Sequence, residues 1–311
     1  MKRPVRFVQC LLGGLRDAAR AGSKPAAARA GAPATPERRF SPAKIALSTL
    51  IGFAIAVVAV SRPLTAPLPT TIDMADMTWI EVRSAIDLGY ATVIVPSGGI
   101  EQNGPHMVLG KHDYVVRFTA ERIASKLGKV LVAPVVSFVP QGDLAPATDN
   151  MRFPGTIGVP DKVFAEVLEG IARSLKSAGF RTICFIADHG PSQIPQKEVA
   201  TRLSREWADD RVKVLSVDDY YADAAQNRYL LSQGETPTSI GDHAGIIDTS
   251  ELLAAHPEGV DLARLAQLPF TLAETGASGN PLKASIERGN ALLELKIDAA
   301  VRQIQSSLPT Q

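Results

Sequence analysis

The stretch that decides the fold reads ATVIVPSGGIEQNGPHMVLGKHDYVVRFTAERIASKLGKVLVAPVVSFV and spans residues 91–139. It opens with a short β-branched apolar run that stops at a Gly-Gly pair, the pattern of a buried strand. Residues 113–127 have helical spacing and are closed by Gly128, and residues 129–139 form a second strand-like run. A strand, a helix and a strand in this order predict a parallel β–α–β unit.

The same alternation continues on both sides of this unit. Further helices are expected over 78–89, 161–178, 195–208 and 284–307, and further strands over 181–188 and 212–218. In the second of these helices, one face collects Phe164, Leu168, Ile171 and Leu175. The pattern predicts an α/β fold with a parallel sheet covered by helices on both faces.

The two ends of the chain differ in charge. Residues 1–66 carry 11 Lys or Arg and 2 Asp or Glu, whereas the remaining 245 residues carry 22 and 30. A mildly acidic main part argues against sequence-independent nucleic-acid binding. The composition also excludes a disordered protein and a polytopic membrane protein, and 2 cysteines exclude a disulfide scaffold.

The first part of the chain is expected to be a leader. Residues 1–44 form a disordered basic segment rich in Arg, Ala, Gly and Pro. Residues 45–61 are 17 apolar or small residues without a charge, which predicts either the apolar core of a signal peptide, with cleavage near Leu64-Thr65-Ala66, or a single transmembrane anchor. Either alternative exports the domain at 67–311, to the periplasm or to the periplasmic face of the inner membrane.

Polar residues gather where the predicted strands end. Segments 97–113, 187–193 and 240–251 hold 4 of the 5 histidines in the chain. The fifth, His256, has the character of an ordinary helix-end residue. Any one of the four taken alone fits a structural hydrogen bond better than a ligand. Their grouping in Gly-rich segments at strand ends, where α/β sheets bind ligands, favours a transition-metal site. Such a metal lowers the pKa of a bound water and polarises a substrate carbonyl.

Other interpretations of single residues remain open at this point. Glu101 alone could be a capping or surface carboxylate, and Asp113 could cap the helix it precedes. Asp188 could orient a ligating histidine or merely be solvated. Competing chemistries are weaker, because the sequence has no GxSxG, Walker, GxGxxG or HExxH motif. Cys184 lies inside an apolar strand, which favours an inert thiol.

Four segments in order resemble the creatininase family of metal-dependent amidohydrolases. They are GGIEQNGPHMVLGKH at 98–112, MRFPGTI at 151–157, ADHGPSQ at 187–193 and DHAGIIDTSELL at 242–253. The resemblance covers roughly residues 79–260. It implies a three-layer α/β/α domain, often assembled as hexamers. It also implies hydrolysis of C–N bonds in cyclic amides, formamides or short peptides with one or two Zn²⁺ or Mn²⁺ ions.

The resemblance also assigns site residues by position. Glu101 matches the first carboxylate ligand and His189 the histidine ligand of the third segment. His112 falls on the bridging aspartate of the family, and Asp113 takes that place if a one-residue shift is allowed. Asn103 falls on the histidine of the second metal.

Three further positions follow from the same match. Pro191 falls on a possible acidic ligand. Asp242 and His243 match the acidic-histidine pair that lines the active site. His106 matches a supporting histidine.

At His112, Asn103 and Pro191 the chain departs from the ligands of the family. The departures predict a site for one metal, zinc or manganese, held by Glu101, His112 and His189. A carboxylate can bridge two metals, but a neutral imidazole offers one lone pair. His243, oriented by Asp242, is then expected to move the proton to the leaving nitrogen. Two alternatives stay open: a degenerate binding protein that keeps the fold, and a metal-dependent hydrolase of esters or lactones. The predicted partner is a small-molecule amide.

Overall fold

The computed structural model describes residues 70–308 apart from 222, 267–270 and 272. The predicted leader at 1–44 and the apolar segment at 45–61 lie outside the described residues. Within the described part of the chain, no helix combines the length and apolarity needed to cross a bilayer.

The described strands form one parallel sheet in the order β2-β1-β3-β4. Its strands are β1 (Thr92–Ser97), β2 (Val130–Val132), β3 (Thr182–Ala187) and β4 (Lys213–Ser216). The helices are α2 (Trp79–Asp87), α3 (Lys111–Leu127), α4 (Asp161–Ala178), α5 (Gln193–Glu206), α6 (Ala224–Ser232), α7 (Pro237–Ile240), α8 (Ile246–Ala255) and α9 (Ile286–Ser307). The predicted α/β class and parallel sheet are confirmed.

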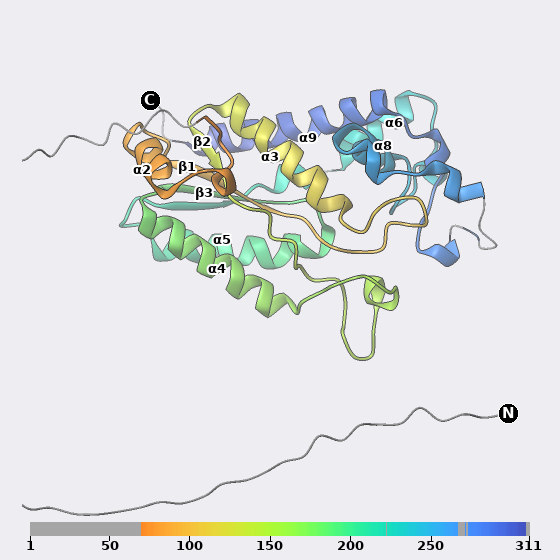
Figure 1. The fold of residues 1–311 in the computed structure, drawn as a ribbon, viewed down its shortest axis with the longest axis horizontal. Helices are drawn as coiled ribbons and strands as arrows, with labels where there is room; N and C mark the ends of the chain where they lie inside the picture. The colour runs from red at the N-terminus through yellow and green to blue at the C-terminus, as the bar shows by residue number, and fades with distance from the viewer. Residues whose placement is uncertain (1–69, 222, 267–270, 272, 309–311) are drawn as a thin grey trace, which may run out of the picture. The chain divides into compact units, whose positions relative to one another are not determined.

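Helices cover both faces of the sheet, giving three layers (Figure 1). Successive strand residues point to opposite faces. Accordingly, Ile94 packs in one core cluster with residues of α3 and α9. Its neighbours Val93 and Val95 pack in the other, with Phe164 of α4 and Leu203 of α5. The two faces of each apolar strand therefore explain why the chain builds helices on both sides.

The second predicted strand is shorter than expected. Residues 129–139 were predicted as one run, but only Val130–Val132 is regular strand, followed by isolated bridges from Val136 to Ser97 and from Val139 to Gly158. Pro134 explains the break, because proline has no N–H to donate to a ladder. The bridge to Ser97 keeps the segment beside the carboxyl end of β1, and the bridge to Gly158 ties it to the residues that precede α4.

Helices α6, α7 and α8 were not predicted. The sequence suggested that the segment at 242–248 follows a strand, but it lies between and within helices: residues 241–245 join α7 to α8, and residues 246–248 begin α8. Helix α8 is seated on α9 at Gly289, where a Cβ atom would lie 1.9 Å from the carbonyl oxygen of Ser250. Glycine at that point permits the close approach that brings α8 against the main body of the domain.

Candidate metal centre

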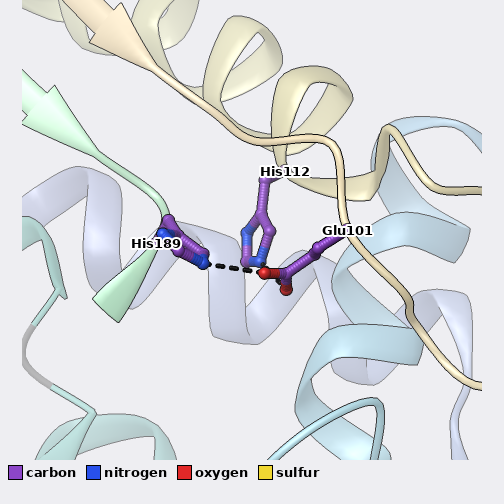
Figure 2. Close-up of side chains that lie close together, drawn as sticks. All are labelled: Glu101, His112 and His189. Carbon is purple, nitrogen blue, oxygen red and sulfur yellow. Dashed lines mark hydrogen bonds and ion pairs between the residues drawn. The ribbon is translucent and has the colours of Figure 1, made fainter. Parts of the chain in front are cut away.

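Three segments from different elements converge beyond the carboxyl ends of the strands. Glu101 lies in the loop after β1, His112 in the first turn of α3, and His189 two residues after β3. Figure 2 shows both imidazoles aimed at the one carboxylate. His112 Nε2 lies 2.8 Å from Glu101 Oε1, and His189 Nε2 lies 2.7 Å from Oε2. One ligand atom from each of the three residues lies within 4.8 Å of the others, and all three side chains are buried.

Contacts behind the two imidazoles fix their orientation. His112 Nδ1 lies 2.9 Å from Asp188 Oδ2, and His189 Nδ1 lies 3.4 Å from Ser192 Oγ. The other oxygen of Asp188 accepts hydrogen bonds from the Tyr220 hydroxyl (2.9 Å) and Lys296 Nζ (2.7 Å). A carboxylate that holds the far nitrogen of a histidine is the usual support for a metal-ligating imidazole.

The charges within the cluster depend on one another. Burial and the Lys111 ammonium oppose a charged His112, but the carboxylates of Glu101 and Asp188 raise the pKa of His112 to about 9. Both nitrogens of His112 contact carboxylates, which fits the imidazolium form, with a proton on each. Burial opposes ionisation of Glu101, yet His112 and His189 hold the pKa of Glu101 well below its ordinary value. Burial lowers the pKa of His189.

Two buried lysines balance further carboxylates around the cluster. Lys296 of α9 lies 2.7 Å from Asp188 Oδ1 and 3.1 Å from Glu251 Oε2. Lys111, next to His112 in α3, lies 2.7 Å from Asp248 Oδ1. Burial opposes both ammonium charges, but these carboxylates raise the pKa of each lysine above its ordinary value. Because each buried charge has a partner, the cluster avoids the penalty of an isolated ion.

His243 presents one imidazole nitrogen to the cluster. Its Nε2 lies 2.9 Å from the carbonyl oxygen of Gln102, which can only accept a hydrogen bond, so Nε2 carries the proton. Its Nδ1 therefore has a free lone pair in the neutral ring, 3.9 Å from Glu101 Oε1. The side chain is 28% exposed, so the histidine stands between the buried cluster and solvent.

The structure differs from the prediction at Asp242. Among the described residues, no hydrogen bond joins its carboxylate to His243, and the carbonyl of Gln102 orients the ring instead. The backbone N–H of Asp242 donates to Ser278 Oγ at 2.8 Å. The adjacency of the two residues in sequence did not reveal this, because side-chain directions in a bent loop depend on distant contacts such as the hydrogen bond to Ser278.

Asp113 and Asn103 are turned away from the cluster. Asp113 Oδ1 accepts from the Gly99 N–H at 2.9 Å, and a Cβ on Gly98 would lie only 2.0 Å from that oxygen. Asp113 therefore braces the Gly-Gly turn; it neither caps α3, whose N-cap is Gly110, nor joins the ligand cluster. Asn103 Nδ2 donates to the carbonyl of Glu101 at 3.0 Å and so stiffens the ligand loop.

His106 is a linking residue. Its Nε2 lies 2.9 Å from Thr249 Oγ1 of α8, and burial lowers the pKa of His106 to about 4. The neutral ring ties the loop after β1 to α8.

Sequence reasoning missed several residues that shape the centre. Asn150 donates from Nδ2 to Glu101 Oε2 at 2.7 Å. Its position just before the MRFPGTI segment was the available signal. The buried cations Lys111 and Lys296 were missed as well, because lysine is an exposed residue in most sequences. Tyr220 gave no motif at all.

The donor set fits a divalent cation. Glu101 supplies a carboxylate and His112 and His189 supply imidazole nitrogens, a set that suits zinc and leaves a coordination position open for catalysis. His112 must give up its Nε2 proton when a metal binds.

Together, the three-layer fold and the Glu–His–His cluster define an α/β protein with a metal-binding centre at the carboxyl edge of a parallel sheet. The chain belongs to the creatininase family, since the sequence model of that family, described as creatinine amidohydrolase, matches residues 75–304. The predicted resemblance is therefore confirmed.

Two curated relatives have recorded activities. The creatinine amidohydrolase of Pseudomonas putida is 26% identical over 258 residues, covering 77% of this chain and 98% of the relative. A mycofactocin precursor peptide peptidase of Mycobacterium tuberculosis is 24% identical over 246 residues, covering 70% and 86%. Among solved structures, a creatinine amidohydrolase matches with a TM-score of 0.63 at 24% identity, covering 78% of this chain and 100% of that one. A manganese form of creatininase matches with a TM-score of 0.62, also at 24% identity, covering 77% of this chain and 100% of that one.

Proposed function

We propose that this protein is a metal-dependent amidohydrolase that cleaves a C–N bond in a cyclic amide, a formamide or a short peptide. One observation carries the proposal: Glu101, His112 and His189 converge within ligand distance, and an oriented His243 lies beside them. Relatives named for hydrolysis of creatinine and of a precursor peptide support the reaction class.

The proposed cofactor is one Zn²⁺ or Mn²⁺ ion per chain. Solved creatininases include a manganese form and a form with two zinc ions, so the fold accommodates both metals. In this chain Asn103 Nδ2 donates to the backbone carbonyls of Glu101 and Val108, whereas its buried Oδ1 has no hydrogen-bond partner among the described residues. His112 offers a single nitrogen to the cluster because its other nitrogen faces Asp188. The single nitrogen that His112 presents to the cluster supports one ion over two.

The residues of the centre have separate proposed roles in hydrolysis. Glu101, His112 and His189 would hold a divalent cation, which when bound would supply an activated water and polarise the substrate carbonyl. His243 Nδ1, which faces the cluster, would accept a proton from the attacking water and return it to the leaving nitrogen. Asp188, neutralised by Lys296, keeps His112 in place throughout.

A small cavity adjoins this machinery. Its volume is about 220 Å³, and its walls include His112, Asp188 and Asp242. Glu101, His189 and His243 do not line this cavity, so it lies beside the cluster, on the side of Asp188 and Lys296.

The test is a hydrolase assay across lactams, formamides and short peptides, with and without a chelator. Turnover that is lost on metal removal and restored by Zn²⁺ or Mn²⁺ supports the proposal. Tight metal binding without turnover on any amide would instead favour the degenerate binding protein.

A second candidate is hydrolysis of a carbonyl compound that is not an amide. A relative from Thermotoga maritima, 24% identical over 198 residues, is named a 3-dehydro-scyllo-inosose hydrolase, and an inosose contains no nitrogen. The match covers 61% of this chain and 58% of that relative. Ester and lactone substrates in the same assay distinguish this candidate.

We also propose that the domain acts outside the cytoplasm. The support is the uncharged run at 45–61 between basic residues and a Pro/Thr-rich segment. Fractionation of cells expressing the full chain, with carbonate extraction to separate a cleaved from an anchored form, tests it. A homo-oligomer, by analogy with the family, is a further expectation that light scattering can check.

A further inference from the structure

Lys111 is a buried cation at the centre that the proposed mechanism does not use. It lies in the first turn of α3 and is only 1% exposed. A positive charge at the amino-terminal end of a helix is disfavoured by the helix dipole. A carboxylate must therefore compensate it, and Asp248 does so at 2.7 Å from Nζ.

Asp248 connects this lysine to the backbone beside His243. Its second oxygen, Oδ2, accepts from the Ala244 N–H at 2.6 Å. Ala244 has a φ of +53°, a left-handed conformation that is strained for a non-glycine residue. A backbone in that conformation persists only when surrounding contacts stabilise it. The hydrogen bond to the Asp248 carboxylate is one such contact.

The strained residue directly follows His243, so it sets the direction from which the imidazole enters. The ring is then located by the Gln102 carbonyl at 2.9 Å, and the backbone is tied to the neighbouring loop by the Ser278 N–H, which donates to the His243 carbonyl at 2.9 Å. The ion pair of Lys111 with Asp248 and the hydrogen bond from the Ala244 N–H to Asp248 are the remaining contacts that locate His243. They also join the loop that carries His243 to the helix that carries His112.

We propose that Lys111 and Asp248 form a clasp that positions His243 at the metal centre. Lys111 is a positioning residue: its ammonium holds Asp248, Asp248 holds the Ala244 N–H, and the held backbone fixes His243 Nδ1 beside Glu101. The proposal rests on the proposed function, since it gives His243 the role of proton carrier.

The experiment uses the zinc-loaded full-length protein and the variants Lys111→Met and Lys111→Arg. Phe164→Leu, in the core beneath α4, serves as a control that is destabilised away from the centre. The first readout is the imidazole nitrogen spectrum of His243, assigned by comparison with His243→Ala. We expect one sharp set of signals with the proton on Nε2 in the wild type, Lys111→Arg and the control. In Lys111→Met we expect His243 signals that are broadened or averaged between tautomers, with the signals of His189 unchanged.

The second readout is turnover. Lys111→Met is expected to lower kcat about 10- to 100-fold with KM within about threefold, because proton transfer depends on geometry. Lys111→Arg should restore most of that loss. In the His243→Ala background, Lys111→Met should change kcat less than twofold, since the lysine acts through the histidine.

An unaltered His243 spectrum in Lys111→Met overturns the clasp, whatever the activity. If Lys111→Met lowers kcat by the same factor in the wild-type and in the His243→Ala background, the clasp is overturned as well. If Lys111→Met does not fold, Asp248→Asn takes its place, with the same expected spectrum and the same overturning result. If no substrate is turned over, the proposed function fails while the spectrum still decides the clasp.

Discussion

Binding of Zn²⁺ to the metal-free protein should expel one proton from His112. Between the carboxylates of Glu101 and Asp188, His112 is an imidazolium with a pKa of about 9. A metal ion needs the Nε2 lone pair, so the ring must become neutral. At pH 6.5 His112 is almost fully protonated, and the lowered pKa of His189 favours its neutral form. One proton per ion is the expected release.

The same linkage fixes the pH dependence of affinity. Release of one proton makes the dissociation constant for zinc fall about tenfold per pH unit, or about 1.4 kcal/mol, while pH stays below the pKa of His112. From pH 6 to pH 7 the affinity should therefore rise about tenfold. Staying at or below pH 7 limits the contribution of a metal-held water, whose pKa is about 7.

Isothermal titration calorimetry in two buffers of different ionisation enthalpy measures this release directly. Asp188→Asn removes one of the carboxylates that charge His112, so it should release fewer protons and show a shallower pH dependence. His256→Ala, at the end of α8, is the matched control and should behave like the wild type. A zinc affinity that is constant from pH 6 to pH 7, with no proton release, would refute the charge state assigned to His112.

The remaining predictions concern other parts of the account. Glu101→Ala should lose its metal, whereas His243→Ala should keep it and lose about 10²- to 10⁴-fold in kcat; unchanged activity in the latter removes that histidine from the mechanism. In the metal-free protein, the raised pKa of His112 contributes stability that is fully present below about pH 6.5. That stability is lost as pH rises through about 9, so urea unfolding at pH 6.5 and 9.5 should show a decline. Phe164→Ala should cost about 3–5 kcal/mol by leaving a cavity under α4, and a loss below 1 kcal/mol would contradict the assigned packing.

Much of the fold could be predicted from the sequence, because the local pattern of apolar residues agrees with the residues that are buried in the structure. The apolar run at β1 and the one-sided apolar face of α4 each specify a single element. The helices at 224–255 were not readable from the sequence. Their order depends on long-range contacts such as the seat of α8 at Gly289, which leave no periodic signal.

The candidate site divides in the same way. The proximity of Glu101 and His189 could be predicted from the sequence, because both follow strands of one parallel sheet. It misjudged the partner of His243, because a backbone carbonyl has no signature in a sequence. It also missed Lys111, whose ammonium is buried only because Asp248 arrives from a distant helix.

The central claim is that one divalent cation sits among Glu101, His112 and His189. The most direct measurement is elemental analysis of protein purified without chelators, together with an anomalous difference map of its crystals at the absorption edge of the metal found. The account predicts one ion per chain and a single peak bonded to these three side chains. Two ions per chain, or a peak elsewhere, would contradict it.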